Sequence, residues 1–183
     1  MFCNKLYNGN VAISNVCEEN LLYSVELRIE RFNAMRSINV QSQEINPEED
    51  ALKKVLEIAK NNNLTNKPCV RLFGRNFYPT TQSEPHGYEY YLIIEGEIKP
   101  SREVVVRNIP DGLYATLRVK GVSEIPQGWK SLFSMVEASG YKPTGVSRQI
   151  YGWVSAGFEE IVNWPHEPSP HAWNINLWLQ LKE

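Results

Sequence analysis

The stretch REVVVRNIPDGLYATLRVKG, residues 102–121, shows the pattern on which the predicted fold depends. Apolar and polar residues alternate on both sides of a turn at residues 110–112, as they do in strands that bury one face. The next segment, residues 123–141, predicts a helix whose apolar face consists of Ile125, Trp129, Leu132, Phe133 and Val136. The remaining predicted elements are a strand, a proline-rich loop and a strand, at residues 145–155, 156–171 and 172–183.

An equivalent series of elements stands about 78 residues earlier. RFNAMRS, residues 31–37, occupies the place where IPDGLYA recurs at residues 109–115. The helix of this first series begins at Asn46, a favourable N-cap, with Pro47 at its first helical position. The predicted elements are a strand broken near Phe32 and Asn33, a helix and two strands, at residues 25–41, 46–64, 69–79 and 88–98. Recurrence at a fixed period indicates an internal duplication.

The predicted fold class is therefore α+β, with duplicated βαββ repeats related by pseudo-twofold symmetry. Repeat one covers residues 25–100 and repeat two residues 101–183, after an N-terminal extension at residues 1–24. We expect an antiparallel sheet with both helices on one side, because an apolar strand face belongs against helices. A ligand groove is expected at the seam between the repeats, where ligand sites are common.

Composition argues against several classes of function. The net charge is −2, from 19 basic and 21 acidic side chains without a local basic cluster, so nothing favours nucleic-acid or membrane-surface binding. Cys3, Cys17 and Cys69 have no metal-ligand spacing, and an odd thiol fits a reduced, cytoplasmic location. No apolar run approaches the roughly 18 residues of a membrane span. His166 and His171 lack a supporting ligand set, so we expect no metal site, and no cofactor motif is present.

The strand HGYEYYLIIEGEI, residues 86–98, contains one glutamate among three tyrosines. Alternate residues of a strand share a face, so Glu89 and Tyr91 lie together on a mixed face. In the last strand, Asn176 and Trp178 form a similar mixed face. The opposite faces of both strands are apolar and belong against the helices. We therefore expect the two mixed faces to point together across the seam.

An acid among aromatic rings suits a cationic ligand, because a desolvated ring face contributes roughly 0.5–2 kcal/mol to binding a positive charge. A buried carboxylate without a partner is unfavourable, so Glu89 would be protonated or would await its ligand. The alternative is a solvated mixed face, with Glu89 a surface charge and Trp178 partly exposed. The pattern of residues leaves both alternatives open.

Five segments resemble, in order, the gyrase-inhibitor-like (GyrI-like), or AraC-type, effector-binding domain superfamily. They are RLFGRNFYP, GYEYYLII, IPDGLYATLRVKG, the helix around Trp129 that ends in ASGY, and INLWLQLKE. The resemblance covers residues 25–183 and implies the duplicated fold with a small-molecule pocket between the halves. In related domains this pocket takes lipophilic, often cationic compounds with aromatic walls and an acidic residue. The resemblance therefore favours Glu89 as the pocket acid.

The resemblance is incomplete in the second repeat. Family members usually have a glutamate in the strand that matches SRQIYGW, where this chain has Gln149 or Gly152. The acidic role therefore falls to Glu89, with Glu159 and Glu160 in the adjacent loop as reserves.

Further aromatic residues are candidates for either the groove or the core. Phe73 in repeat one and Tyr151 and Trp153 in repeat two stand in equivalent strands and could line the groove. Tyr114, in a GxYA pattern, could donate its hydroxyl to the pocket or cap the end of the sheet. Trp164, in the proline-rich loop, could be a lid residue.

Three functions remain for this pattern. The leading hypothesis is a stand-alone module that binds or senses a lipophilic, cationic small molecule, without direct nucleic-acid binding by this chain. The alternative is a hydrolase of strained or electrophilic molecules, because a subset of stand-alone relatives resembles hydrolases of cyclopropane-containing compounds. In that case Glu89 would act as general base and Tyr91 would orient or protonate the leaving carbon. The second alternative is a protein-interaction inhibitor of the gyrase-inhibitory type, and a protein partner or homodimer is compatible with these readings.

Overall fold

The computed structural model of the chain describes residues 26–65, 70–77, 87–93, 105–144 and 157–183. These residues form one eight-stranded antiparallel sheet in the order β1-β6-β8-β7-β3-β4-β2-β5, together with two α-helices. The strands are β1 (Arg28–Phe32), β2 (Met35–Ser42), β3 (Arg71–Phe77), β4 (Gly87–Ile93), β5 (Val105–Ile109), β6 (Gly112–Lys120), β7 (Gly157–Ile161) and β8 (Asn174–Gln180). The helices are α1 (Pro47–Asn61) and α2 (Ile125–Ala138), with short 3-10 turns η1 (Val122–Glu124) and η2 (Pro170–Ala172).

The strand order is symmetric about its centre. Outward from the central pair, β3 corresponds to β7, β4 to β8, β2 to β6 and β5 to β1. Each repeat also lends its first strand to the other, because β1 pairs with β6 and β5 pairs with β2. This arrangement confirms the predicted α+β class with duplicated repeats and pseudo-twofold symmetry.

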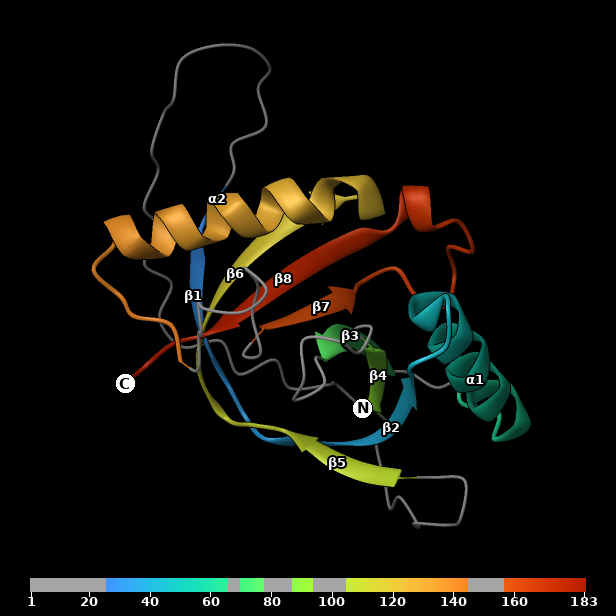
Figure 1. The fold of residues 1–183 in the computed structure, drawn as a ribbon. Coiled ribbons are helices and arrows are strands. Elements are labelled where there is room, and N and C mark those ends of the chain that lie inside the picture. The colour runs from blue at the N-terminus through green and yellow to red at the C-terminus, as the bar shows by residue number, and fades with distance from the viewer. Residues whose placement is uncertain (1–25, 66–69, 78–86, 94–104, 145–156) are drawn as a thin grey trace.

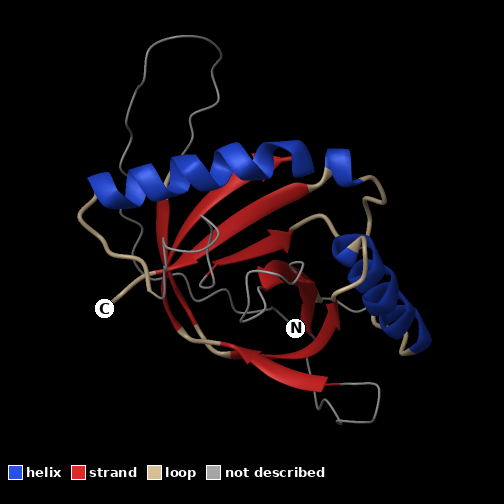
Figure 2. Ribbon diagram, viewed as in Figure 1, coloured by secondary structure: helices blue, strands red, loops and turns tan. Residues whose placement is uncertain are grey.

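Both helices cover the same face of the sheet, here called the helix face (Figures 1 and 2). The α1 helix packs on β2 and β4 through Ala51 and Val55, and α2 packs on β6 and β8 through Leu132. At Gly128 a Cβ atom would lie 2.6 Å from Val119 and 2.7 Å from Leu177, so the absence of a side chain lets α2 approach the sheet closely. The predicted helix-covered apolar faces are therefore confirmed.

The other face of the sheet, here called the inner face, is the concave side of a strongly curved sheet. Phe32 on β1 and Phe73 on β3 have ring centroids 6.1 Å apart, although β6, β8 and β7 separate their strands. The sheet therefore curls into a half-barrel around a second buried cluster. This cluster consists of Phe32, Phe73, Tyr91, Ile93, Ile109, Tyr114, Phe158 and Trp178.

Two sequence-based assignments in repeat two need correction. The β7 strand lies in the segment predicted to be a loop, because its residues pair with β3 on one side and β8 on the other and bury Phe158 and Ile161. Trp164, a possible lid residue, is buried in the core of the helix face. The strand predicted at residues 145–155 and the predicted boundaries at residues 24 and 100 lie outside the described residues.

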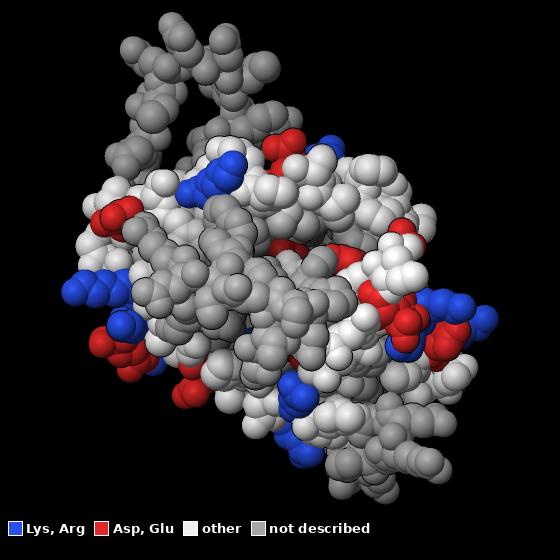
Figure 3. Space-filling model, viewed as in Figure 1, with Lys and Arg blue, Asp and Glu red and all other residues white. Residues whose placement is uncertain are grey.

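Charged side chains of both signs are mixed on the face of the molecule that Figure 3 draws. On the face drawn in Figure 3, lysines and arginines are interspersed with acidic residues and form no broad field of one sign. In the described ranges, the helices are too short or too polar to cross a lipid bilayer. The same ranges contain no cluster of three His, Cys, Asp or Glu side chains placed to hold a metal ion.

Candidate ligand-binding site

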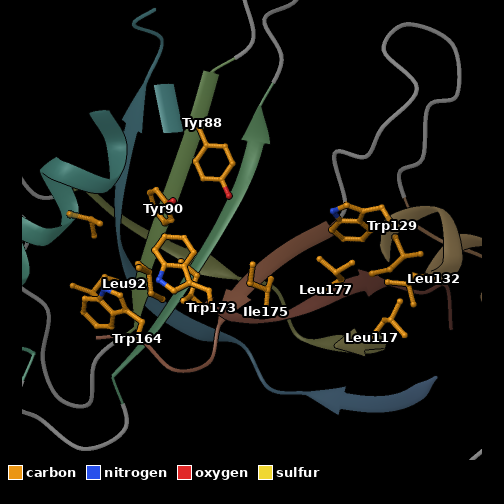
Figure 4. Close-up of a cluster of buried hydrophobic side chains, with 14 of the residues drawn as sticks. Tyr88, Tyr90, Leu92, Leu117, Trp129, Leu132, Trp164, Trp173, Ile175 and Leu177 are labelled. Carbon is orange, nitrogen blue, oxygen red and sulfur yellow. The ribbon is translucent and has the colours of Figure 1, made fainter. Parts of the chain in front are cut away.

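A cavity of about 400 Å³ lies on the helix face, at the seam between the repeats. The first turns of α1 and α2 border it, and β3, β4, β7 and the start of β8 contribute to its lining. Its largest side chains are Tyr88, Tyr90 and Trp173, which Figure 4 shows gathered on one side of the core cluster. The cavity lies at the predicted seam but on the helix face, whereas the predicted groove lay on the face that carries Glu89 and Trp178. We call it the seam cavity.

One carboxylate stands at the centre of a hydrogen-bond network in this cavity. The Tyr88 hydroxyl donates to Oε2 of Glu159 at 2.8 Å, and the Trp129 indole Nε1 donates to Oε1 at 3.0 Å. These three side chains come from β4, β7 and α2, so the network joins both repeats. The two hydrogen bonds thus give the Glu159 carboxylate a defined orientation.

A glycine makes this network possible. Gly74 on β3 pairs with Tyr90 on β4 and with Glu159 on β7. A Cβ atom at position 74 would lie 2.8 Å from Cε1 of the Tyr88 ring, which is closer than side chains tolerate. The missing side chain lets the Tyr88 ring cross the strand and bring its hydroxyl to Glu159.

The electrostatics of the seam cavity are acidic. Burial raises the pKa of the Glu159 carboxyl, against the opposing effect of the Trp129 and Tyr88 hydrogen bonds, and the charge of Glu48 raises it further. Within the described part of the chain, no lysine or arginine pairs with Glu159, and none lines the cavity. Glu48 and Glu49 add acidic side chains from the first turn of α1.

Comparison with known families identifies the fold and the class of site. The model of the GyrI-like small molecule binding domain matches residues 26–182, which is most of the chain. The chain belongs to this family. No curated protein shows a significant match to this chain.

Solved structures similar to this GyrI-like domain share its fold at low sequence identity. EcmrR in a complex with DNA has a TM-score of 0.61 at 12% identity, covering 87% of this chain and 58% of EcmrR. The isolated EcmrR C-terminal domain has a TM-score of 0.60 at 12% identity, covering 87% of this chain and 98% of that domain. A hydrolase from Listeria innocua has a TM-score of 0.57 at 11% identity, covering 85% and 91% of the two chains. The GyrI-like domain thus spans little more than half of the EcmrR chain in that complex.

The acid predicted from the sequence lies on the inner face of this GyrI-like domain, away from the seam cavity. The Glu89 carboxylate, with 1% of its side chain exposed, pairs with Arg75 Nε at 2.5 Å and with Arg107 Nη1 at 3.5 Å. It also accepts hydrogen bonds from Tyr91 Oη at 2.6 Å and from Gln41 Nε2 at 2.7 Å. Burial alone would raise the pKa of Glu89, but these hydrogen bonds and the charge of Arg75 hold it below its ordinary value.

The predicted aromatic residues do come together on this inner face. Arg75 lies over the rings of Tyr91 and Phe158, at 5.3 and 5.0 Å from their centroids. Arg71 lies 4.8 Å from the centroid of Phe73 and 5.8 Å from that of Trp178. The sequence predicted that these aromatic faces would contact a ligand cation. In the structure they contact guanidinium groups of the chain itself.

Three of the remaining candidates form hydrogen bonds within the chain. Asn176 and Trp178 donate to Oε2 of Glu160 at 3.1 and 3.0 Å. Tyr114 donates to the Pro110 carbonyl at 3.1 Å, which agrees with the alternative of a cap at the end of the sheet. Tyr151 and Trp153 lie outside the described residues. Ligand contact by the inner-face residues stays a prediction.

Sequence reasoning missed most of the seam cavity. It assigned Tyr88 and Tyr90 to the helix face as part of the apolar side of β4, and it held Glu159 only as a reserve. It also overlooked Trp173 and the first turn of α1. A usable signal was present, because two tyrosines on the core side of a strand bring hydroxyl groups that need partners when buried. Glu159 stayed a reserve because its segment was predicted to be a loop.

Proposed function

We propose that this GyrI-like domain binds lipophilic cations in the seam cavity, with Glu159 as the acidic contact. The observation that supports this most directly is the partly buried Glu159 carboxylate, which lines an aromatic-walled cavity without a positively charged partner among the described residues. Tyr88 and Trp129 hold it by hydrogen bonds but do not neutralise it. A cation would supply the missing charge.

The walls of the cavity favour a lipophilic ligand. Tyr88, Tyr90 and Trp173 offer aromatic surface, and Ile125 and Ile161 add aliphatic surface. Ring faces attract a delocalised positive charge by roughly 0.5–2 kcal/mol each when water is excluded. A cavity of about 400 Å³ also lies within the range of small-molecule sites. Charge and shape therefore point to the same class of ligand.

The test compares two ions of one shape and opposite charge, tetraphenylphosphonium and tetraphenylborate, by calorimetric titration. The wild type should bind the cation and discriminate against the anion. Glu159→Gln keeps the size of the side chain and removes its charge, so it should lose cation affinity by about tenfold or more. Glu137→Gln removes an exposed charge from α2, away from the cavity, and should bind as the wild type does.

A parallel titration of Glu89→Gln decides between the two acids. The proposal expects this variant to retain cation selectivity, provided that it is folded at the temperature of the titration. Loss of selectivity in folded Glu89→Gln, with normal binding by Glu159→Gln, would move the site to the inner face. Absence of cation binding by the wild type would remove the proposal altogether.

A second candidate function is hydrolysis at the same cavity. A carboxylate with a raised pKa next to a tyrosine hydroxyl is an acid–base pair, and Glu159 and Tyr88 form such a pair beside open volume. Glu159 would take a proton from water as its oxygen attacks a strained ring, and Tyr88 would protonate the leaving atom. Hydrolysis with Glu89 as general base and Tyr91 as its partner stays a prediction. The lowered pKa of Glu89 makes it a weak base, which disfavours this mechanism.

Turnover would be tested with aryl epoxides, whose hydrolysis adds one water across a carbon–oxygen bond. Mass spectrometry should show diol formation that Glu159→Gln abolishes and Glu137→Gln does not. Cation binding without diol formation would leave the chain a binding module. The interaction-inhibitor hypothesis stays a prediction.

A further inference from the structure

Asn76 on β3 has a buried acceptor that receives no hydrogen bond from the described residues. This acceptor, the side-chain oxygen Oδ1, is shielded from solvent, and the residue belongs to the lining of the seam cavity. Buried acceptors in native proteins are nearly always paired, because an unpaired one has lost its water and gained nothing in return. A ligand in the cavity would supply the missing donor once the side chains that shield this oxygen move aside.

The strand register places Asn76 and Glu159 at opposite ends of the Tyr88 side chain. Asn76 pairs with Tyr88 across β3 and β4, and Gly74 pairs with Glu159 across β3 and β7. The Tyr88 ring crosses Gly74, and its hydroxyl reaches Glu159 at 2.8 Å. Asn76 and Gly74 are separated by about 7 Å along the strand. A cation over the Tyr88 ring would therefore have an acceptor on each side.

We infer that the seam cavity selects cations that carry N–H bonds, that is, protonated amines, over quaternary ions of the same shape, and that Asn76 is a specificity-determining residue. This inference rests on the proposed function, because it requires the cation to occupy the seam cavity. It adds the chemical class of the cation, which charge and aromatic walls alone leave open.

The physical reason is the difference between charge and hydrogen bonding. Both kinds of cation neutralise Glu159 and contact the aromatic rings. Only an ammonium with an N–H bond donates a charge-assisted hydrogen bond to an acceptor. A quaternary ion presents methyl groups and leaves the Asn76 oxygen unpaired, and a site with polar groups left unpaired discriminates against such an analogue.

The experiment uses two probes that differ by one methyl group, N-methyldibenzylamine, protonated at neutral pH, and N,N-dimethyldibenzylammonium. Calorimetric titration of the wild type should give an affinity about tenfold higher for the protonated amine. Asn76→Leu has a side chain of similar size without an acceptor, and it should bring the two affinities close together while the quaternary ion binds as in the wild type. Asn76→Asp keeps an acceptor and should retain the preference.

The outcomes separate this inference from the proposed function. If the wild type binds neither probe, the proposed function fails and this inference fails with it. If the wild type binds both probes equally, or if Asn76→Leu retains the full preference, the inference is overturned while cation binding stands. Should Asn76→Leu fail to fold by circular dichroism, Asn76→Ala takes its place as the variant without an acceptor, because the Glu159 carboxylate accepts an N–H in the wild type and in Asn76→Asp alike. A ratio near one in the wild type, or the full preference in the folded variant without an acceptor, overturns the role of Asn76.

Discussion

The guanidinium group of Arg75 lies 5.3 Å from the centre of the Tyr91 ring. The same side chain pairs with the Glu89 carboxylate at 2.5 Å, so the inner face contains an acid, aromatic rings and a cation that all belong to the chain. A ligand cation would have to displace Arg75 there. The seam cavity on the opposite face has an acid and aromatic rings with space beside them. The two faces thus hold similar residues in different charge environments.

Glu89→Gln should destabilise the fold. Removal of the buried carboxylate from a charge pair is destabilising, by about 3 kcal/mol in the free energy of unfolding. Arg75 and Arg107 would both lose their carboxylate. Urea denaturation followed by circular dichroism measures the loss. Exposed Glu137→Gln should change the free energy of unfolding by less than about 0.5 kcal/mol, and an equal effect of both variants would contradict the assignment.

The pH dependence of stability should show the contribution of Glu89. Its pKa is lower in the folded protein than its ordinary value of 4.5, so the folded state favours the ionised form. This stability is present above the ordinary pKa and is lost as the pH falls through the folded-state pKa. Thermal melting in a series of acidic buffers should show a steeper fall for the wild type than for Glu89→Gln. Parallel curves of melting temperature against pH would show that Glu89 contributes nothing to the pH dependence of stability.

Ionisation of Glu159 should change the pH dependence of stability in the opposite direction. Its pKa is raised above 4.5, so the folded state favours the protonated form. This stability is present below the ordinary pKa and is lost as the pH rises through the raised folded-state pKa. Glu159→Gln is neutral at every pH and should exceed the wild type in stability by about 1 kcal/mol in mildly alkaline buffer. The difference should shrink in acidic buffer, and a wild type that stays the more stable protein in alkaline buffer would refute this assignment.

Gly74→Ala should disrupt the seam cavity. The added methyl group would meet the Tyr88 ring and push its hydroxyl away from Glu159. Overpacking of this kind typically costs about 1–3 kcal/mol in the free energy of unfolding. Tyr88→Phe removes the hydroxyl without adding volume, so it separates loss of the hydrogen bond from steric strain. If Gly74→Ala instead keeps the stability and the cation affinity of the wild type, Tyr88 has room to move.

Trp129→Phe should shift the pH at which cations bind. The Trp129 hydrogen bond lowers the pKa of Glu159, so its loss raises that pKa further. Because the ionised carboxylate is the form that binds a cation, affinity rises with pH through the pKa of Glu159, and the variant should need a higher pH. Titration with tetraphenylphosphonium over a pH series gives the midpoint. An unchanged midpoint would exclude an electrostatic role for the indole.

Local sequence patterns predicted an element correctly where its segment shows one clear hydrophobic period. The apolar stripe of α2 and the alternation of β8 predicted their elements and their buried faces, and the duplication predicted the seam. The β7 strand was missed because GFEEI has two adjacent glutamates beside a proline-rich segment, and its strand conformation depends on pairing with β3 and β8. Such pairing joins residues far apart in the chain, which local sequence does not encode.

The sequence by itself determined the duplicated α+β fold, the faces on which Glu89 and Tyr88 lie, and the family resemblance, because these follow from periodicity and from the order of elements. Tertiary structure alone decided which of the two acids pairs with arginine side chains. Arg75 and Arg107 reach Glu89 from β3 and β5, whereas Glu159 meets only the uncharged donors Tyr88 and Trp129 among the described side chains. The charge environment of a carboxylate depends on which distant strands lie within a few ångströms of it, and that is a property of the folded chain.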